Sequence, residues 1–315
     1  MSEIGDAAIK SLNLYSESFR KQYGYKECCL LVISLVFCST VYSANWEIKP
    51  SITLREIYSD NIALETDREE DDWVTDISPG VIITADGNRL DLQFDYSLQN
   101  LIYSNDSDRN SSNHRLNTRL QTELVENIFF FDANARISQQ LVDIREGLSN
   151  DRISGSQNAE DVYGYSLSPY LTPRLGDLLS AEIRYTYDYV DSEEDNVNNS
   201  FSDDSEGDHL SVSIENGERL ASLRFQVEYD SREVDYGDGD RTDTEYLRVL
   251  MGYWLNRNWS INLISNDENN EFIGDRGDND PDDSYYGAGF TWRPSDNFNI
   301  SLAYNDRTDP RRGED

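Results

Sequence analysis

Long stretches in which apolar and polar residues alternate are the feature that most limits how this chain can fold. In the segment NRLDLQFDYSLQNLIYSND, alternation begins at Leu90 and continues to about Ile102. Successive side chains of a β-strand point to opposite faces of a sheet, so this segment predicts a strand with one apolar and one polar face. Such a strand is roughly twice as long as an ordinary one.

The same pattern recurs along the chain, and no segment shows the period of an amphipathic helix at comparable strength. We count thirteen predicted strands. They are Trp46–Tyr58, Asp76–Thr84, Leu90–Ile102, Arg115–Leu124, Phe129–Gln140, Tyr163–Leu171, Leu179–Val190, Leu210–Ile214, Ala221–Asp230, Glu245–Leu255, Trp259–Ser265, Tyr285–Arg293 and Phe298–Asn305.

The connections between these strands fall into two alternating kinds. Short turns such as Asp86–Arg89 and Asn216–Arg219 contain Asp-Gly or Asn-Gly, which favour tight hairpins. Between them lie long acidic segments, including Ser59–Asp72, Asp191–Asp208 and Asn266–Ser284. A soluble β-sandwich has no reason to sort loop lengths by side, whereas an outer-membrane barrel does. The sequence therefore predicts an all-β fold, a transmembrane antiparallel up-and-down β-barrel.

The strand count and the C-terminus suggest that the barrel continues. Bacterial single-chain barrels have an even number of strands, and thirteen is odd. The chain stops in RTDPRRGED, Arg307–Asp315, which resembles the beginning of another outer loop. We expect residues 45–315 to form a barrel that is incomplete at its C-terminus, with about 14–18 strands in the complete protein. A missed or split strand is the alternative.

The N-terminal region predicts export. Basic residues at Arg20, Lys21 and Lys26 precede the apolar run Cys28–Phe37, which is too short to span a bilayer as a helix. Small residues follow, so residues 1–44 have the layout of a signal peptide, and we expect its true start to lie downstream of Met1. All three cysteines fall within it, so the exported part has no disulfide. The expected location is the outer membrane of a Gram-negative bacterium.

Charge limits the partners. The chain has 61 acidic and 27 basic residues and a net charge of −34. Binding to nucleic acid is not expected, because it requires clustered Lys and Arg. We expect contact with outer-membrane lipid and lipopolysaccharide, with divalent cations at the acidic outer loops. The weak Ca²⁺ candidates compete with a plain solvated acidic loop; they are Asp238, Asp240, Asp280, Asp282 and Asp283.

The polar faces of the predicted strands carry charges of both signs, which would line the interior of a barrel. They either tune a water-filled channel or pair across neighbouring strands. The candidates are Asp91, Asp95, Arg115, Arg119, Glu123, Asp132, Arg136, Glu182, Arg184, Arg224, Glu228 and Arg248.

The segments PSITLREIYSDNIAL and VTDISPGVIITADGNRLDLQFDYSLQN resemble the N-terminal half of the PEP-CTERM system-associated outer-membrane proteins. The resemblance is strongest over Trp46–Gln140. It implies a β-barrel beside an exosortase and exopolysaccharide system, with polysaccharide or export-system proteins as partners. The family's motifs are structural, so no functional residue carries over.

Three classes of function follow. The first is a porin-like channel or export component, and the second is a structural or surface-interaction barrel with acidic, cation-binding outer loops. The third is an outer-membrane enzyme, which we do not expect. The chain has two histidines, His114 and His209. The serines Ser111, Ser112 and Ser211 lie near them in sequence, but no catalytic motif is present. We expect no catalytic residue, no resident metal and no cofactor.

Overall fold

The chain divides into two compact units, Met1–Ser43 and Ala44–Asp315. The computed structural model describes residues 44–63, 69–141, 153, 159–192, 204–237, 239–274 and 283–308, all in the second unit. The predicted signal peptide lies almost wholly outside the described residues and stays a prediction. The strands are β1 (Asn45–Ser59), β2 (Asp72–Asp86), β3 (Leu90–Tyr103), β4 (Ser111–Val125), β5 (Phe129–Leu141), β6 (Ala159–Leu171), β7 (Arg174–Leu175), β8 (Leu179–Ser192), β9 (Ser205–Asn216), β10 (Leu223–Tyr236), β11 (Arg241–Asn256), β12 (Trp259–Ile273), β13 (Asp283–Ser295) and β14 (Phe298–Thr308).

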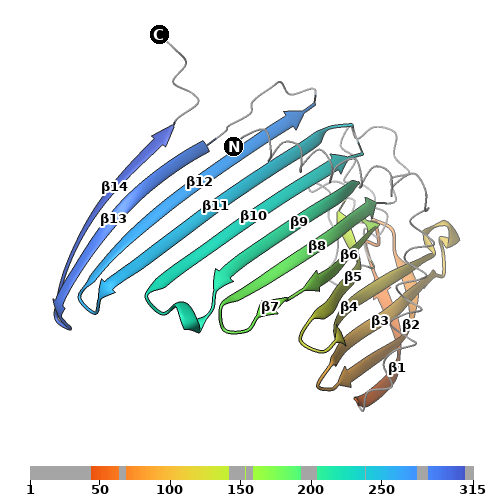
Figure 1. The fold of residues 1–315 in the computed structure, drawn as a ribbon. Coiled ribbons are helices and arrows are strands. Elements are labelled where there is room, and N and C mark those ends of the chain that lie inside the picture. Colours follow the sequence, from red (N-terminus) through yellow and green to blue (C-terminus); the bar gives the residue numbers. More distant parts are fainter. Residues whose placement is uncertain are drawn as a thin grey trace, which may run out of the picture. The chain divides into compact units, whose positions relative to one another are not determined.

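These strands form one antiparallel sheet in which, apart from β7, each strand pairs with the strands that precede and follow it along the chain. The sheet curves from β1 at one edge to β14 at the other, as Figure 1 shows. All thirteen predicted strands are present, and the two-residue β7, which pairs only with β8, is an addition. The predicted all-β, up-and-down architecture is confirmed. Among the described residues β1 and β14 do not pair with each other, so the sheet is open.

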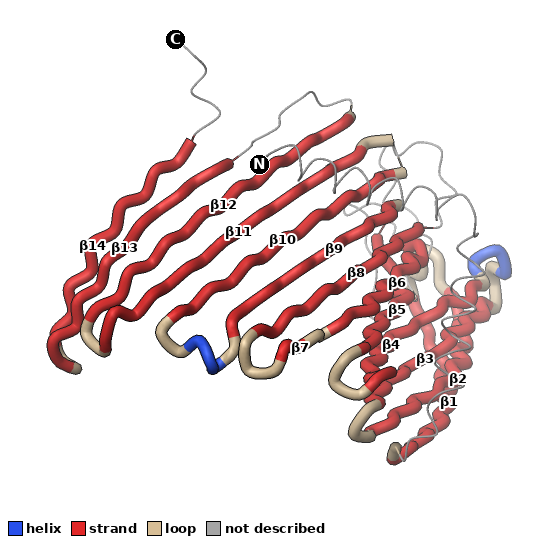
Figure 2. The backbone as a smooth tube through the Cα atoms, viewed as in Figure 1, coloured by secondary structure: helices blue, strands red, loops and turns tan. Residues whose placement is uncertain are grey.

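The connections are sorted by the end of the sheet, as Figure 2 shows. At one end the chain turns within a few residues, for example at 87–89, 257–258 and 296–297. At the other end two connections are shorter than we expected. The β3–β4 connection is residues 104–110 and contains a 3-10 turn. The β10–β11 connection is residues 237–240.

The strands also extend further than the alternation of their sequence. The pattern predicted only Leu210–Ile214 for β9, which runs from Ser205 to Asn216. Strand pairing is made by the backbone, so a ladder can continue past the point where one face must be apolar. Polar residues such as Glu206 and Asp208 therefore remain in register with β8 and β10.

The register gives the sheet two chemically different faces, because residues directly opposite one another share a face. We call the face that carries Leu92, Phe94 and Leu263 the apolar face. Its side chains are unusually exposed: Ile52 is 74% and Leu302 is 66% accessible. Exposed apolar patches on such a scale mark a surface made to contact another apolar phase.

Aromatic residues gather toward the strand ends of this apolar face. Trp259 and Trp292 stack with ring centroids 5.2 Å apart near the short turns. Near the opposite end, the Tyr286 hydroxyl donates to Asp306 at 3.1 Å, and the ring centroids of Tyr58 and Trp73 lie 5.2 Å apart. Rings with one apolar and one wet end suit the two interfaces of a membrane. The apolar band is thus bounded on both sides.

A single charge placed in this band tests the assignment of the two faces. Leu263→Arg would place a guanidinium on the apolar face, and we expect it to lower the free energy of unfolding by about 2–4 kcal/mol in lipid vesicles. The neighbouring Asn262→Arg projects from the other face and is the matched control. Urea unfolding of both variants in vesicles measures the difference, and equal losses would contradict the assignment.

Candidate functional site

The opposite face of the sheet, which we call the polar face, carries the predicted interior charges. The register places Asp95 of β3 opposite Asn117 of β4, and Asn117 opposite Arg136 of β5. When the register partners are followed in the same way from strand to strand, all twelve candidates lie on this face. They are Asp91, Asp95, Arg115, Arg119, Glu123, Asp132, Arg136, Glu182, Arg184, Arg224, Glu228 and Arg248.

Several of these charges form ion pairs across strands. Arg184 of β8 contacts Asp132 of β5 at 3.1 Å and Glu182 at 2.9 Å. Its guanidinium also lies 3.6 Å from the centre of the Tyr170 ring, which stacks on Phe130. This arginine is therefore held on three sides. Such pairs keep charge on the polar face without the penalty of an uncompensated buried ion.

Two further ion pairs involve the predicted residues. Arg248 of β11 lies 3.7 Å from Glu228 of β10, directly opposite in the register. Glu123 lies 3.2 Å from Arg89, which precedes β3. The pairing interpretation therefore holds for part of the set.

Other arginines of the polar face have no ion pair or hydrogen bond within the part of the chain that the structure describes. Arg115 and Arg119 follow one another along this face of β4, with Asn117 between them, and Arg136 lies opposite that asparagine. Arg224 of β10, opposite Gly252, is in the same situation. These guanidinium groups are available to a solute.

The sequence did not single out two polar-face pairs. Asp76 is fully buried and accepts from Arg55 Nε at 3.0 Å and from Arg55 Nη2 at 2.5 Å. On β9 and β10, His209 Nε2 lies 2.9 Å from Asp230 Oδ1. Arg55 and Asp76 both occupy alternating positions of their strands, which was the available signal, but only the register shows that they are opposite.

A cavity of about 580 Å³ lies on the polar face of β1–β4. Its lining includes Arg55 and Arg115, with Gln99, Asn113 and several serines between them. The cavity is thus lined both by a predicted residue, Arg115, and by Arg55, whose pair with Asp76 the sequence did not reveal.

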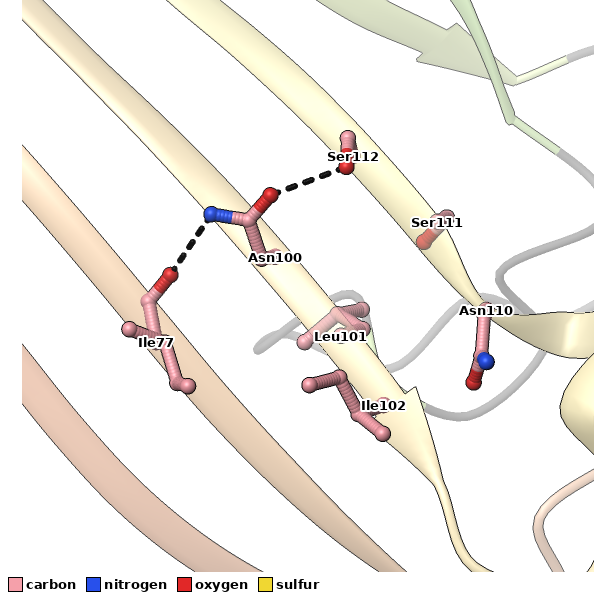
Figure 3. A pocket seen from close by; sticks show the side chains of 7 residues that line it. All are labelled: Ile77, Asn100, Leu101, Ile102, Asn110, Ser111 and Ser112. Atoms are coloured by element: carbon pink, nitrogen blue, oxygen red, sulfur yellow. Dashed lines mark hydrogen bonds between the residues drawn. The ribbon is translucent and has the colours of Figure 1, made fainter.

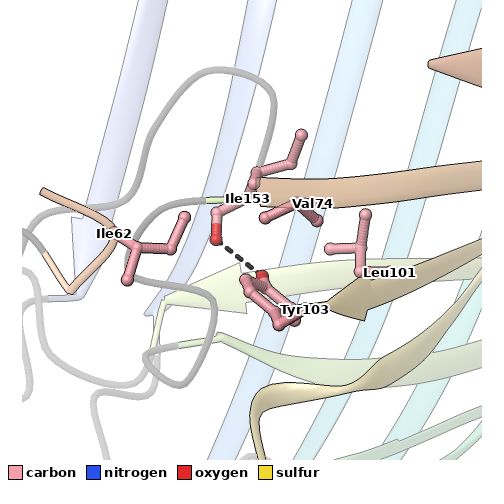
Figure 4. Close-up of a cluster of buried hydrophobic side chains, with 5 residues drawn as sticks. All are labelled: Ile62, Val74, Leu101, Tyr103 and Ile153. Carbon is pink, nitrogen blue, oxygen red and sulfur yellow. Dashed lines mark hydrogen bonds between the residues drawn. The ribbon is translucent and has the colours of Figure 1, made fainter. Parts of the chain in front are cut away.

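A buried hydrophobic cluster covers the polar face just beyond this cavity, and it contradicts a uniformly wet face. The cluster is shown in Figure 4, where the Tyr103 hydroxyl donates to the carbonyl oxygen of Ile153 at 2.7 Å. The ends of β2 and β3 away from the short turns, which we call the outer ends, contribute to it together with the connections that follow β1 and β5. Its members are Ile62, Val74, Leu101, Tyr103 and Ile153. Connections that pack on a strand end create a local core that alternation cannot predict.

Truncation of this cluster should be costly. Leu101 is 1% exposed, so Leu101→Ala removes fully buried methyl groups and should lower the free energy of unfolding by about 2–5 kcal/mol. Ile102→Ala is the control, since Ile102 is 46% exposed on the apolar face. Urea titrations of both variants in the same detergent measure the effect. A smaller loss for Leu101→Ala than for Ile102→Ala would contradict the cluster.

The apolar face has a shallow pocket at its outer end, drawn in Figure 3. Asn100 donates through Nδ2 to the carbonyl oxygen of Ile77 at 3.1 Å and accepts from Ser112 at 2.9 Å. The β2–β3 register is interrupted at Pro79, which has no N–H to donate, and the Asn100 side chain bridges the strands beside that interruption. At this pocket a side chain links the two strands where the backbone ladder is interrupted.

The histidines and serines of the enzyme alternative are engaged in ordinary contacts. His114 Nδ1 lies 2.9 Å from the Tyr96 hydroxyl, and Ser112 binds Asn100. Ser211 lies on the same face as His209, but the ring of His209 faces Asp230. Among the described residues neither imidazole is hydrogen-bonded to a serine hydroxyl, which is the contact that would activate a serine nucleophile.

The weak Ca²⁺ candidates are only partly visible. Asp238, Asp280 and Asp282 lie outside the described residues. Asp283 is bound by Arg307 at 2.7 Å, and the backbone oxygen of Asp240 accepts from Tyr236 N at 2.8 Å. In the described ranges no three acidic, histidine or cysteine residues converge on a metal position. Calcium binding stays a prediction.

Comparisons with known proteins give the fold's neighbours. Within the described ranges, no helix is long and apolar enough to cross a membrane. No family model and no curated protein matches the sequence. Three solved structures resemble the sheet at low identity. They are OmpT, an outer membrane protein of Vibrio cholerae (12% identity, TM-score 0.34, covering 85% of this chain and 90% of that chain), an anion-selective porin from Comamonas acidovorans (10%, 0.32, 84% and 90%) and an outer membrane channel from Pseudomonas putida F1 (14%, 0.26, 86% and 97%). Likeness at this level carries no argument about activity.

Proposed function

We propose that this chain forms the wall of an outer-membrane channel for polar or charged solutes. The observation that carries the proposal is the division of one curved sheet into two faces, one exposing large apolar side chains and one carrying charges of both signs. A bilayer covers the first face without cost. The second requires water or ionic partners, because unpaired charge in an apolar interior is prohibitive. A barrel that lies in a bilayer and has a water-filled lumen provides lipid for the apolar face and water for the charged face.

Closure of the wall is a condition of the proposal. No open sheet edge persists in lipid, where the backbone has no water to bond. The strands alternate in direction from β1 to β14 along the main path of the sheet, so the two edge strands run the same way. An antiparallel ladder can therefore join the edges only through an odd number of additional strands. Those strands, from this polypeptide or another copy, are part of what we propose.

An association with an exopolysaccharide export system belongs to the proposal as well. Its support is the resemblance of the segments around Pro50 and Val81 to outer-membrane proteins that accompany such systems. Deletion of the gene would then abolish polymer secretion while other outer-membrane proteins insert normally. Unchanged secretion would remove this part of the proposal and leave the channel itself standing.

Ion conductance tests the channel directly. In planar bilayers we expect the purified protein to conduct, and we expect the double variant Arg119→Glu, Arg136→Glu to shift the reversal potential toward cation selectivity. Both residues lie on the polar face without ion pairs in the described structure, so a change of their sign alters the field in the lumen.

The control places one charge reversal of the same kind outside the lumen. Arg257 lies exposed in the short β11–β12 turn, so Arg257→Glu should leave the reversal potential unchanged. A protein that inserts but stays closed under all voltages would overturn the channel proposal. Equal shifts for both variants would show that the selectivity does not arise at the polar face.

The structural or surface-interaction barrel remains the second candidate, and one observation favours it. Four carboxylates lie opposite one another across β9–β12 on the outer ends of the apolar face, Asp208, Glu233, Asp243 and Glu271. Arg241 contacts Glu233 at 3.1 Å and Asp243 at 2.9 Å. Like charges in register repel, so cations are expected to accumulate there.

Binding to lipid tests this second candidate. Asp208→Asn, Glu271→Gln would remove half of the row while keeping the contacts of Arg241. If the row engages anionic lipid phosphates through Mg²⁺, binding to lipopolysaccharide vesicles should weaken in Mg²⁺ and be unchanged in its absence. Flotation of the protein with vesicles measures this, and equal flotation of both proteins in Mg²⁺ would remove the candidate.

A further inference from the structure

We infer that the cavity on the polar face of β1–β4 is a binding site for the carboxylate of an acidic sugar, a uronic acid. This deepens the proposed channel function, because it requires the polar face to be wet and assigns a class of solute to it. The argument comes from the shape of the cavity, its charge and its hydrogen-bonding groups.

Small residues produce the hollow. Ser51, Gly80 and Ser97 lie opposite one another in one row across β1, β2 and β3. A Cβ atom at Gly80 would come within 2.9 Å of Ser51 Oγ and 3.2 Å of the Tyr96 carbonyl oxygen, so a larger residue there would force these neighbours to shift. The resulting volume of about 580 Å³ is within the range of small-molecule sites.

Two arginines supply positive charge. Arg115 continues the small-residue row onto β4, opposite Ser97, and has no hydrogen bond or ion pair within the described ranges. Arg55 gives Nε and Nη2 to Asp76, and its Nη1 has no partner among the described residues. Planar guanidinium groups with free donors suit a carboxylate.

The cavity also lacks the opposite charge, which is notable in a chain with 61 acidic residues. No aspartate or glutamate side chain is part of its described lining. Asp76 lies beneath Arg55, is fully buried, and also accepts from Ser78 and from Gln99 at 3.4 Å. It positions the donors and is not offered to a solute.

Hydroxyl and amide groups make up most of the remaining lining. Ser51, Thr53 and Ser97 supply hydroxyls, and Gln99 and Asn113 supply amides. Each of these groups can both donate and accept, as a ring bearing several hydroxyls requires. A simple inorganic anion would use the arginines and leave these groups without a role. The lining therefore favours a hydroxylated carboxylate.

The surroundings provide an approach. Arg119 and Arg136 lie next along the polar face from Arg115, without ion pairs in the described structure. Asp95, opposite Asn117, lies among them, so the arginines outnumber the carboxylate beside the cavity. On the other side, the hydrophobic cluster around Leu101 and Tyr103 closes the face. An anionic sugar would thus reach the cavity from the side of the short turns.

Calorimetric titration of the full-length protein in detergent with D-glucuronate, D-glucose and inorganic phosphate tests the site. We expect saturable glucuronate binding, no measurable glucose binding, and a rise in the glucuronate Kd of at least about tenfold in Arg115→Gln, since hydrogen bonds to a charged group are roughly twice as strong as neutral ones. Arg224→Gln removes an equally unpaired arginine from the same face outside the cavity, and it should bind glucuronate as the unchanged protein does.

A second variant covers a failure of Arg115→Gln to fold, which circular dichroism would reveal. Ser51→Phe, on the exposed edge strand β1, fills the cavity without removing charge and should also abolish glucuronate binding. Equal losses in Arg115→Gln and Arg224→Gln, glucose binding as strong as glucuronate binding, or phosphate competing at equal concentration would each overturn the assignment. Because binding is measured without a bilayer, a protein that binds glucuronate but does not conduct contradicts only the channel.

Discussion

The backbone hydrogen-bond ladder is the interaction on which the rest of this structure depends, because in the proposed barrel each strand meets two different solvents at once. Lipid offers no partner to an N–H or C=O group, so every such group within the apolar band has to be satisfied by the neighbouring strand. The ladder also fixes register, and a slip by one residue would exchange Leu263 and Asn262 between the faces. Where Pro79 interrupts it, the Asn100 side chain reaches the Ile77 carbonyl oxygen.

The polar face shows how a sheet carries charge on one side only. Arg184 is held by Asp132, Glu182 and the Tyr170 ring, while Arg115, Arg119 and Arg136 have no such partners in the described ranges. The first arrangement braces neighbouring strands, and the second leaves guanidinium groups to act on whatever enters. Both kinds of arginine sit at alternating positions of their strands. Their difference in role comes from their surroundings: Arg184 has Tyr170 opposite it, Glu182 on its own strand and Asp132 on β5.

At the outer end of the sheet, beyond the apolar band, the side chains of both faces change in character. The strands continue past the apolar band with carboxylates such as Asp208 and Glu233 in register. On the polar face, Ile62 and Ile153 pack on Val74 and Leu101 and form a small core. The cavity lined by Arg55 and Arg115 lies between this core and the mixed charges below, where small residues replace large ones.

The sequence by itself determined the thirteen longer strands, their order, the two faces and the polar-face position of all twelve predicted charges, because the apolar residues that alternate with the charges in each strand mark the opposite face. Strand ends were harder to predict, since the backbone pairs beyond the residues whose side chains alternate. Only the tertiary structure decided which residues are opposite: Asp76 beneath Arg55, Ser97 beside Arg115, and Ile153 on Tyr103. These contacts join positions distant in the chain, and local alternation contains no information about how far apart two strands are or which loop folds back onto them.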